Sequence, residues 1–257
     1  MKAKDIADIL EKFCPPKFAC DWDNTGMIVG HRDNEIKRIL VTVDADDKAV
    51  EYALNNNCDM IIAHHPLIFS GVRQINDDSF TGRRVMKLIE NHINCYCMHT
   101  NFDTAGGMAE KAADLINLKN CVVLEEVKDG EGIGRVGELP APMTVRKLCE
   151  LVKERFGIKA VSLYGDENMT VSKAAICPGS GKDEIPAALS LGAQVLITGD
   201  ISYHYGIDSV SEGLQIIDAG HYGIEHIFIE IMEDYLNKNL RDVVICSMDI
   251  DNPQKII

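Results

Sequence analysis

The sequence lacks the features that mark three broad classes of protein. No apolar run approaches the roughly 18 uninterrupted residues of a membrane-spanning helix. Its 26 lysines and arginines form no cluster and face 40 aspartates and glutamates, so the formal net charge of −14 disfavours nucleic acid as a partner. The opening stretch MKAKDIADILEKF has the pattern of an amphipathic helix, without the apolar centre of a secretory signal. We therefore expect a cytoplasmic protein that contacts no membrane.

Paired cysteine motifs are missing as well. The nine cysteines are an odd number and include no CxxC pair, so we expect reduced thiols. The stretch CYC, from Cys95 to Cys97, leaves two alternatives open, a metal site or small residues of a half-buried strand, and the second is favoured.

An internal repeat is present instead. The segment VTVDADDKAVEYALNNNCDMIIAH, which starts at Val41, aligns without a gap on ICPGSGKDEIPAALSLGAQVLITG, which starts at Ile176, at an offset of 135 residues (176 − 41). Each copy reads as an apolar strand, a helix and a second apolar strand. Strands that are apolar on both faces indicate a parallel sheet covered by helices.

The pattern continues beyond both copies with another helix and strand, and the first copy carries about fifteen additional residues, PLIFSGVRQINDDSF, before that helix. We therefore expect an α/β fold of two related three-layer α/β/α halves, with mainly parallel sheets and a metal site between the halves. Residues 1–124 would form the first half. Residues 125–257 would form the second, including EEVKDGEGIGRVGELPAPMT as a connecting segment rich in glycine and charge.

Metal-ligand residues cluster where the predicted strands end. In open parallel sheets, ligands bind outside the carboxyl ends of the strands. His64 and His65 follow one strand and Asp103 follows the next, while His221 and Glu225 follow the corresponding strand of the second copy. If the chain is helical from residue 222 onward, His221 and Glu225 share one helix face. The sequence therefore predicts that these five residues are metal ligands.

Each of these residues also has an alternative interpretation. Adjacent histidines in a strand point to opposite sides, although the turn at Pro66 can direct both imidazoles to one centre or to two neighbouring ones. Asp103 could cap a helix that begins near Gly107. His221 and Glu225 could form an ordinary helical pair. Their recurrence at equivalent points of two repeats favours the metal interpretation.

Three imidazoles and two carboxylates suit zinc, iron, manganese or nickel. Five donors are too many for one catalytic ion with an open position, but they suffice for two divalent ions if a carboxylate bridges them. Two such ions carry more positive charge than two carboxylates neutralise. This surplus favours an anionic small-molecule ligand such as phosphate.

Seven motifs in order resemble the Nif-three-like family of dinuclear metal-centre proteins, which are called GTP cyclohydrolase I type 2 homologues. They are DWDNTGMIVG, AHHP, HTNFD, GIGRVGEL, CPGSG, ITGDISYH and AGHYGIE, and they span nearly the whole chain. The resemblance implies a toroidal homohexamer whose metal sites face an internal cavity. It also implies that His65 and Asp103 hold one metal, that His64 and His221 hold the other, and that Glu225 bridges them.

Other residues near these motifs have weaker indications. His99 could carry a proton or make a plain turn hydrogen bond. Asp200 and His204 could orient a ligand, or Asp200 could cap a helix that starts at Ser202. The Asp23–Asn24 turn is expected to pack near the site, and the glycines of CPGSG could cradle phosphate or only form a tight turn.

The leading functional hypothesis is a dinuclear metal-dependent hydrolase of a nucleotide-like or phosphorylated substrate, with His99 as the catalytic residue. The alternative hypothesis is a non-catalytic metal-handling or regulatory protein. A third option is an interaction protein whose metals hold the two halves together.

Overall fold

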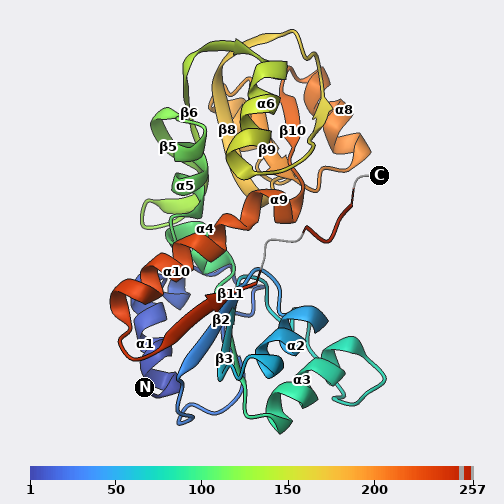
Figure 1. Ribbon diagram of the computed structural model, residues 1–257. Coiled ribbons are helices and arrows are strands. Elements are labelled where there is room, and N and C mark those ends of the chain that lie inside the picture. The colour runs from blue at the N-terminus through green and yellow to red at the C-terminus, as the bar shows by residue number, and fades with distance from the viewer. Residues whose placement is uncertain (249–251, 256–257) are drawn as a thin grey trace. The chain divides into compact units, whose positions relative to one another are not determined.

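The computed structural model describes residues 1–248 and 252–255, and the chain forms two compact units (Figure 1). The first unit comprises residues 1–106 and 228–248, and the second comprises residues 107–227 and 252–255. Each unit contains one sheet with helices, so the expected mixed α/β fold with two sheets is confirmed. Among the described residues, no helix combines the length and the apolar character that crossing a bilayer requires.

The sheet of the first unit has five strands in the order β1-β4-β3-β2-β11. Strands β2, β3, β4 and β11 run parallel through β11–β2, β2–β3 and β3–β4 pairs, and β1 is antiparallel to β4. The strands are β1 (Gly26–Val29), β2 (Arg38–Thr42), β3 (Met60–Ala63), β4 (Asn94–Cys97) and β11 (Val244–Ser247).

Helices cover this sheet because both of its faces are apolar. On one face Leu40, Ile61 and Cys95 pack with apolar residues of α2 and α3, and on the other Ile39 and Ile62 are also fully buried. The helices of the unit are α1 (Ala3–Phe13), the short 3₁₀ helix η1 (Pro16–Phe18), α2 (Asp47–Asn55), α3 (Phe80–Glu90), α4 (Thr100–Ala105) and α10 (Ile227–Asn239).

The sheet of the second unit has six strands in the order β5-β6-β8-β9-β10-β7. Strands β8, β9 and β10 are parallel, and the outer strands are antiparallel to their neighbours. The strands are β5 (Lys119–Lys128), β6 (Glu131–Thr144), β7 (Ser162–Tyr164), β8 (Thr170–Ser180), β9 (Val195–Gly199) and β10 (Gln215–Asp218). The helices are α5 (Met108–Leu115), α6 (Val145–Phe156), α7 (Ile185–Ser190), α8 (Tyr203–Ser211) and α9 (His221–Glu225).

The internal repeat is confirmed at the level of strand register. Val41 pairs with Ile62 across β2 and β3, and Ile176 pairs with Ile197 across β8 and β9, so the offset of 135 holds on both strands. The third strand follows at an offset of 121 (215 − 94). The first copy therefore carries 14 extra residues (135 − 121), close to the insertion expected from the sequence.

The segment expected to be a connection is a long β-hairpin, β5 and β6, which forms one edge of the second sheet. The glycines and charged residues of this segment therefore belong to paired strands and their turn. Asp129 and Gly130 both have positive φ, of 55° and 81°, and an Asp-Gly pair of this kind is a strong hairpin turn signal.

The two units also divide the chain differently from the expected boundary at residue 124. Helix α5 packs on β6 and β8, which places it in the second unit. Near the other end, the Tyr235 hydroxyl on α10 donates to the Ile9 carbonyl at 2.9 Å, and its ring stacks on Phe13. Strand β11, red in Figure 1, pairs with the blue strand β2. The C-terminal segment thus completes the first unit.

Candidate metal centre

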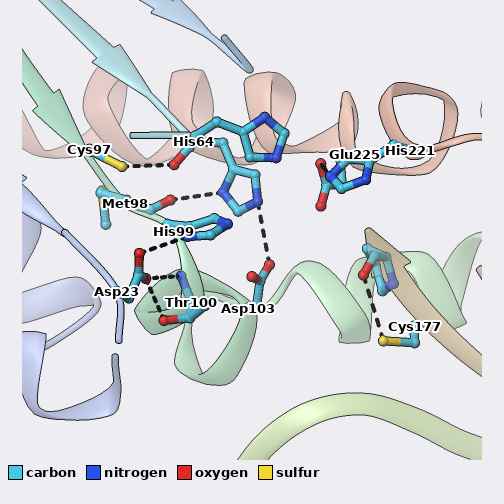
Figure 2. Close-up of polar contacts among 12 residues, drawn as sticks. Asp23, His64, Cys97, Met98, His99, Thr100, Asp103, Cys177, His221 and Glu225 are labelled. Atoms are coloured by element: carbon cyan, nitrogen blue, oxygen red, sulfur yellow. Dashed lines mark hydrogen bonds and ion pairs between the residues drawn. The ribbon is translucent and has the colours of Figure 1, made fainter. Parts of the chain in front are cut away.

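His64 follows β3 directly and is fully buried. Its ring packs against Phe102 and Phe228, with centroids 6.1 Å and 5.1 Å away. The Nδ1–H donates to the Met98 carbonyl at 2.8 Å, as Figure 2 shows. A carbonyl oxygen can only accept, so the proton of neutral His64 lies on Nδ1 and its lone pair on Nε2.

His65 is fixed in the same way by a carboxylate. Its Nδ1 lies 2.9 Å from Oδ1 of Asp44, a residue just beyond the end of β2. The rings of His64 and His65 have centroids 4.9 Å apart. Adjacent histidines would diverge in a strand, but these follow its last residue and lie side by side, as the turn at Pro66 predicted.

Asp103 lies inside α4, and the helix after it, α5, has Gly107 at its N-cap. The capping alternative for Asp103 is therefore excluded. The Asp103 Oδ1 atom lies 3.5 Å from Nε2 of His64. The structure thus pairs Asp103 with His64, whereas the family resemblance implied that it pairs with His65.

His99 and Asp23 form a further pair in the first unit. The Nδ1–H of His99 donates to Oδ1 of Asp23 at 2.8 Å, and Thr100 donates to Oδ2 from its backbone N–H at 3.0 Å and from its hydroxyl at 2.5 Å (Figure 2). Burial alone would raise the pKa of Asp23, but the hydrogen bonds from His99 and Thr100 outweigh it and lower that pKa to about 2. Asp23 therefore stays ionised and holds His99 with Nε2 as the available nitrogen.

Three imidazoles of the first unit form one cluster. Ring nitrogens of His64, His65 and His99 lie within 4.8 Å of one another. Three neutral imidazoles at such spacing are a donor set that suits zinc, iron and nickel.

In the second unit, His221 and Glu225 occupy the first and last positions of α9, as expected from their spacing. The Nε2 of His221 lies 3.0 Å from Oε2 of Glu225, whose side chain is only 4% exposed. On the other side of the ring, Nδ1 donates to Oδ2 of Asp200 at 2.9 Å. Figure 2 shows His221 and Glu225 next to each other.

Asp200 is the position equivalent to His65 in the repeat, and its backbone has a φ of 55°, in the left-handed region. The helix that follows has Ser202 at its N-cap, so Asp200 does not cap it. Its carboxylate orients His221 instead. His204 is exposed on α8, and its ring lies next to that of Tyr203.

Two glycines make room for the donors of α9. A Cβ at Gly179, which has a φ of 79°, would lie 2.5 Å from Oε1 of Glu225. A Cβ at Gly199 would lie 2.7 Å from the backbone nitrogen of His221. The glycine at position 179 in CPGSG therefore serves the close approach of Glu225, which accounts for it without a phosphate loop.

Sequence reasoning missed the roles of Asp44 and Asp23. The sequence pattern predicted no role for Asp44 and only a packing role for the turn of Asp23, although each of these aspartates orients an imidazole. The signal for Asp44 was its place just past the end of a parallel strand. The favoured interpretation of CYC as strand residues is confirmed, although Cys95 and Cys97 in β4 are fully rather than half buried.

The histidines fit a metal because of how their rings are held. His64, His65 and His221 each bond through Nδ1 to an oxygen, from Met98, Asp44 and Asp200 respectively. An outer oxygen acceptor on one ring nitrogen, with the other nitrogen directed to the ion, is the usual arrangement of metal-ligating histidine.

Comparisons with known proteins identify the family of this chain. The model of the Duf34/NIF3 (NGG1p interacting factor 3) family matches residues 1–253. A Clostridium acetobutylicum protein named GTP cyclohydrolase 1 type 2 homolog is 36% identical over 241 residues, which cover 92% of this chain and 90% of that protein. A Clostridium perfringens protein of the same name is 35% identical over the whole of both chains. The crystal structure of a Bacillus cereus protein related to NIF3 has the same fold, with a TM-score of 0.91 at 21% identity over 100% of this chain and 99% of that one.

Proposed function

Because this chain belongs to the DUF34/NIF3 family, we propose that it is a dinuclear metal-dependent hydrolase of a nucleotide-like or phosphorylated substrate. One observation carries the proposal. Three histidines at equivalent ends of two repeated sheets are all held through Nδ1 by oxygen acceptors, which leaves Nε2 of each as the metal-binding nitrogen.

The proposed ligands are His64, His65, Asp103, His221 and Glu225. We assign His64 and Asp103 to one ion because Nε2 of His64 lies 3.5 Å from Oδ1 of Asp103. His65 and His221 would then bind the second ion, and Glu225 would bridge the two ions. The ions would be zinc, iron, manganese or nickel. Two neighbouring divalent ions lower the pKa of a bound water and neutralise negative charge that develops on a substrate.

The residues of the chain supply orientation and proton transfer. Asp44 and Asp200 fix the ring planes of His65 and His221. His99 is the proposed proton carrier, because Asp23 keeps its Nδ1 protonated and stabilises the imidazolium that forms when Nε2 accepts a proton. The side chain of His99 is 13% exposed, so a substrate in solvent can reach it.

GTP is the first substrate to test, since the relatives are named GTP cyclohydrolase 1 type 2 homologs. In that reaction, water would add at C8 of guanine and the imidazole ring would open, with His99 carrying a proton. Hydrolysis of a phosphoester at the same centre is the variant. The two are separated by their products, because ring opening changes the purine absorbance and phosphoester hydrolysis releases phosphate.

We also propose that the protein is a homo-oligomer, a ring of six chains as the family resemblance implies. Light scattering on the purified protein would then give a mass near six times the 28.4 kDa of one chain. A mass of one or two chains would contradict the ring and leave the metal proposal unaffected.

The metal proposal is tested by metal content. Purified protein should hold about two transition-metal ions per chain, because five donors and a bridging carboxylate suit two ions. Glu225→Gln keeps the side-chain shape but weakens the bridge, and Glu225→Ala removes it, so both should lose most of the metal. Glu212→Ala, at an exposed glutamate that ends α8, is the matched control and should retain it. A content near one that survives Glu225→Ala would refute the dinuclear assignment.

Turnover then separates the enzyme from the metal-handling alternative. Metal-loaded protein is incubated with GTP and with phosphoesters, beside the Glu225→Gln and Glu212→Ala variants. Turnover that disappears only in Glu225→Gln supports the hydrolase. Rapid release of the metal to a chelator, without turnover of any substrate, supports metal handling.

A further inference from the structure

Two large aromatic side chains lie exposed next to the imidazole cluster of the first unit. Trp22, the one tryptophan of the chain, is 62% exposed, and Phe69 is 60% exposed. Their ring centroids are 5.8 Å apart and their planes are tilted by 49°. Adjacent exposed aromatic rings mark a binding surface more often than isolated apolar residues do.

The backbone that carries these rings is held in place. Asp23, the residue after Trp22, has a fully buried carboxylate that accepts three hydrogen bonds, from His99 and Thr100. The Asn24 side chain donates to the Ile68 carbonyl at 2.6 Å, which ties the loop of Trp22 to the loop of Phe69. The aromatic pair is therefore pre-organised, so a ligand that binds it orders little additional chain.

His99 connects this pair to the proposed chemistry. The rings of Trp22 and Phe69 each make a T-shaped contact with the His99 ring, at centroid distances of 5.9 Å and 6.2 Å. The centroid of the His99 ring also lies 5.4 Å from that of His64 and 5.5 Å from that of His65. A group bound on the aromatic pair would thus be next to the proposed proton carrier.

The geometry of the pair favours a flat ligand. Trp22 and Phe69 are tilted rather than stacked, so neither ring covers the face of the other. Exposed aromatic faces bind nucleobases by stacking, which needs no base-specific hydrogen bonds. We propose that Trp22 and Phe69 form a stacking platform that binds the planar heteroaromatic ring of the substrate beside His99. This inference rests on the proposed function and narrows its substrate to molecules that contain such a ring.

Fluorescence of Trp22 tests the platform directly, because no other tryptophan contributes to the signal. Metal-free and metal-loaded protein are titrated with guanosine, GTP and tripolyphosphate. Guanosine and GTP should quench the fluorescence to saturation, whereas tripolyphosphate, which has no ring, should leave it unchanged. Loss of one stacking partner corresponds to roughly 1–3 kcal/mol, or about 5- to 150-fold in affinity. Phe69→Ala should therefore raise the dissociation constant of guanosine at least about fivefold.

Phe80→Ala is the matched control. Phe80, the first residue of α3, belongs to the same unit and is 57% exposed. Its ring lies under the guanidinium of Arg84 instead of beside His99. Its removal should leave guanosine binding unchanged. In turnover assays, Trp22→Leu should raise KM for GTP, whereas Trp22→Phe keeps an aromatic face and should restore it.

Three results would overturn the platform. These are equal quenching by tripolyphosphate, an equal effect of Phe69→Ala and Phe80→Ala, and an oligomer mass that falls in the Trp22 and Phe69 variants, which would make the pair an interface between copies of the chain. The proposed function fails separately. Guanosine binding without turnover would support the platform and contradict the hydrolase. Turnover without quenching of Trp22 would support the hydrolase and contradict the platform.

Discussion

The two copies of the repeat have the same strand pairing but different side chains at the carboxyl ends of their strands. The pairing of β2 with β3 recurs between β8 and β9 at the same offset of 135 residues. In the first copy Asp44, His64 and His65 follow these strands. The second copy has Gly179, Gly199 and Asp200 at the equivalent positions.

The second copy places its donors one element further along. His221 and Glu225 lie on the short helix α9, and the glycines at the strand ends leave room for them. A carboxylate orients an imidazole in both copies, Asp44 for His65 and Asp200 for His221, although the two carboxylates follow different strands. The repeated sheet therefore sets where donors can gather, and the side chains after each strand decide which donors they are.

The largest expected effect on metal content comes from a side chain at Gly179, which would fill the space beside the Glu225 carboxylate in the second copy. Gly179→Ala places a Cβ 2.5 Å from Oε1 of Glu225 and should displace that carboxylate, so the metal content should fall to a small fraction of the normal value. Gly192→Ala is the matched control, because Gly192 also has a positive φ, of 73°, but has open space around it.

Both glycine variants should lose about 1 kcal/mol of unfolding free energy, the cost of a side chain in the left-handed region. Metal analysis and chemical denaturation measure the two effects. Equal metal contents in Gly179→Ala and Gly192→Ala would show that the space at Gly179 does not serve Glu225.

A smaller effect is expected from the orienting carboxylates. Asp44→Asn and Asp200→Asn keep the side-chain shape but weaken the acceptor for the imidazole Nδ1–H, so metal affinity should fall about tenfold, the lower end of the range for such outer residues. Competition with a chelator measures the affinity. Asp208→Asn, at an exposed position of α8, should have no effect. A loss in only one of the two variants would mean that the copies contribute unequally to the centre.

The smallest effect concerns four helix ends that the copies share. Just past their C-caps, α2 and α3 have Asn57 and His92, with φ of 52° and 58°. At the equivalent positions, α7 and α8 are followed by Gly192 and Gly213, also with positive φ. The Cβ of histidine has a steric cost in this region, whereas the short side chain of asparagine offsets part of that cost by hydrogen bonding locally. His92→Gly should raise the unfolding free energy by about 0.5–1 kcal/mol, and Asn57→Gly should leave it nearly unchanged. Urea denaturation measures both, and a loss of stability in His92→Gly would contradict the argument.

Much of the fold was predictable because its signals are local. The apolar runs at Met60–Ala63 and Val195–Gly199 are parallel strands as expected, and the spacing of His221 and Glu225 predicted their shared helix face. The hairpin of β5 and β6 was missed although its Asp-Gly turn was visible in the sequence. The relation of Asp103 to His64 was also missed, since the direction of adjacent side chains beyond a strand end depends on the packing of both rings.

The duplicated strand-helix-strand pattern, the family and the candidate ligands follow from the sequence alone, because apolar periodicity and motif spacing are properties of short segments. The strands that extend each sheet, and the oxygen that holds each imidazole, emerge only in the folded chain. Strand β11 pairs with β2 although about 200 residues separate them, and His99 bonds to Asp23, 76 residues away. Such contacts form only when the burial of apolar surface brings distant segments together, and no short stretch of sequence records them.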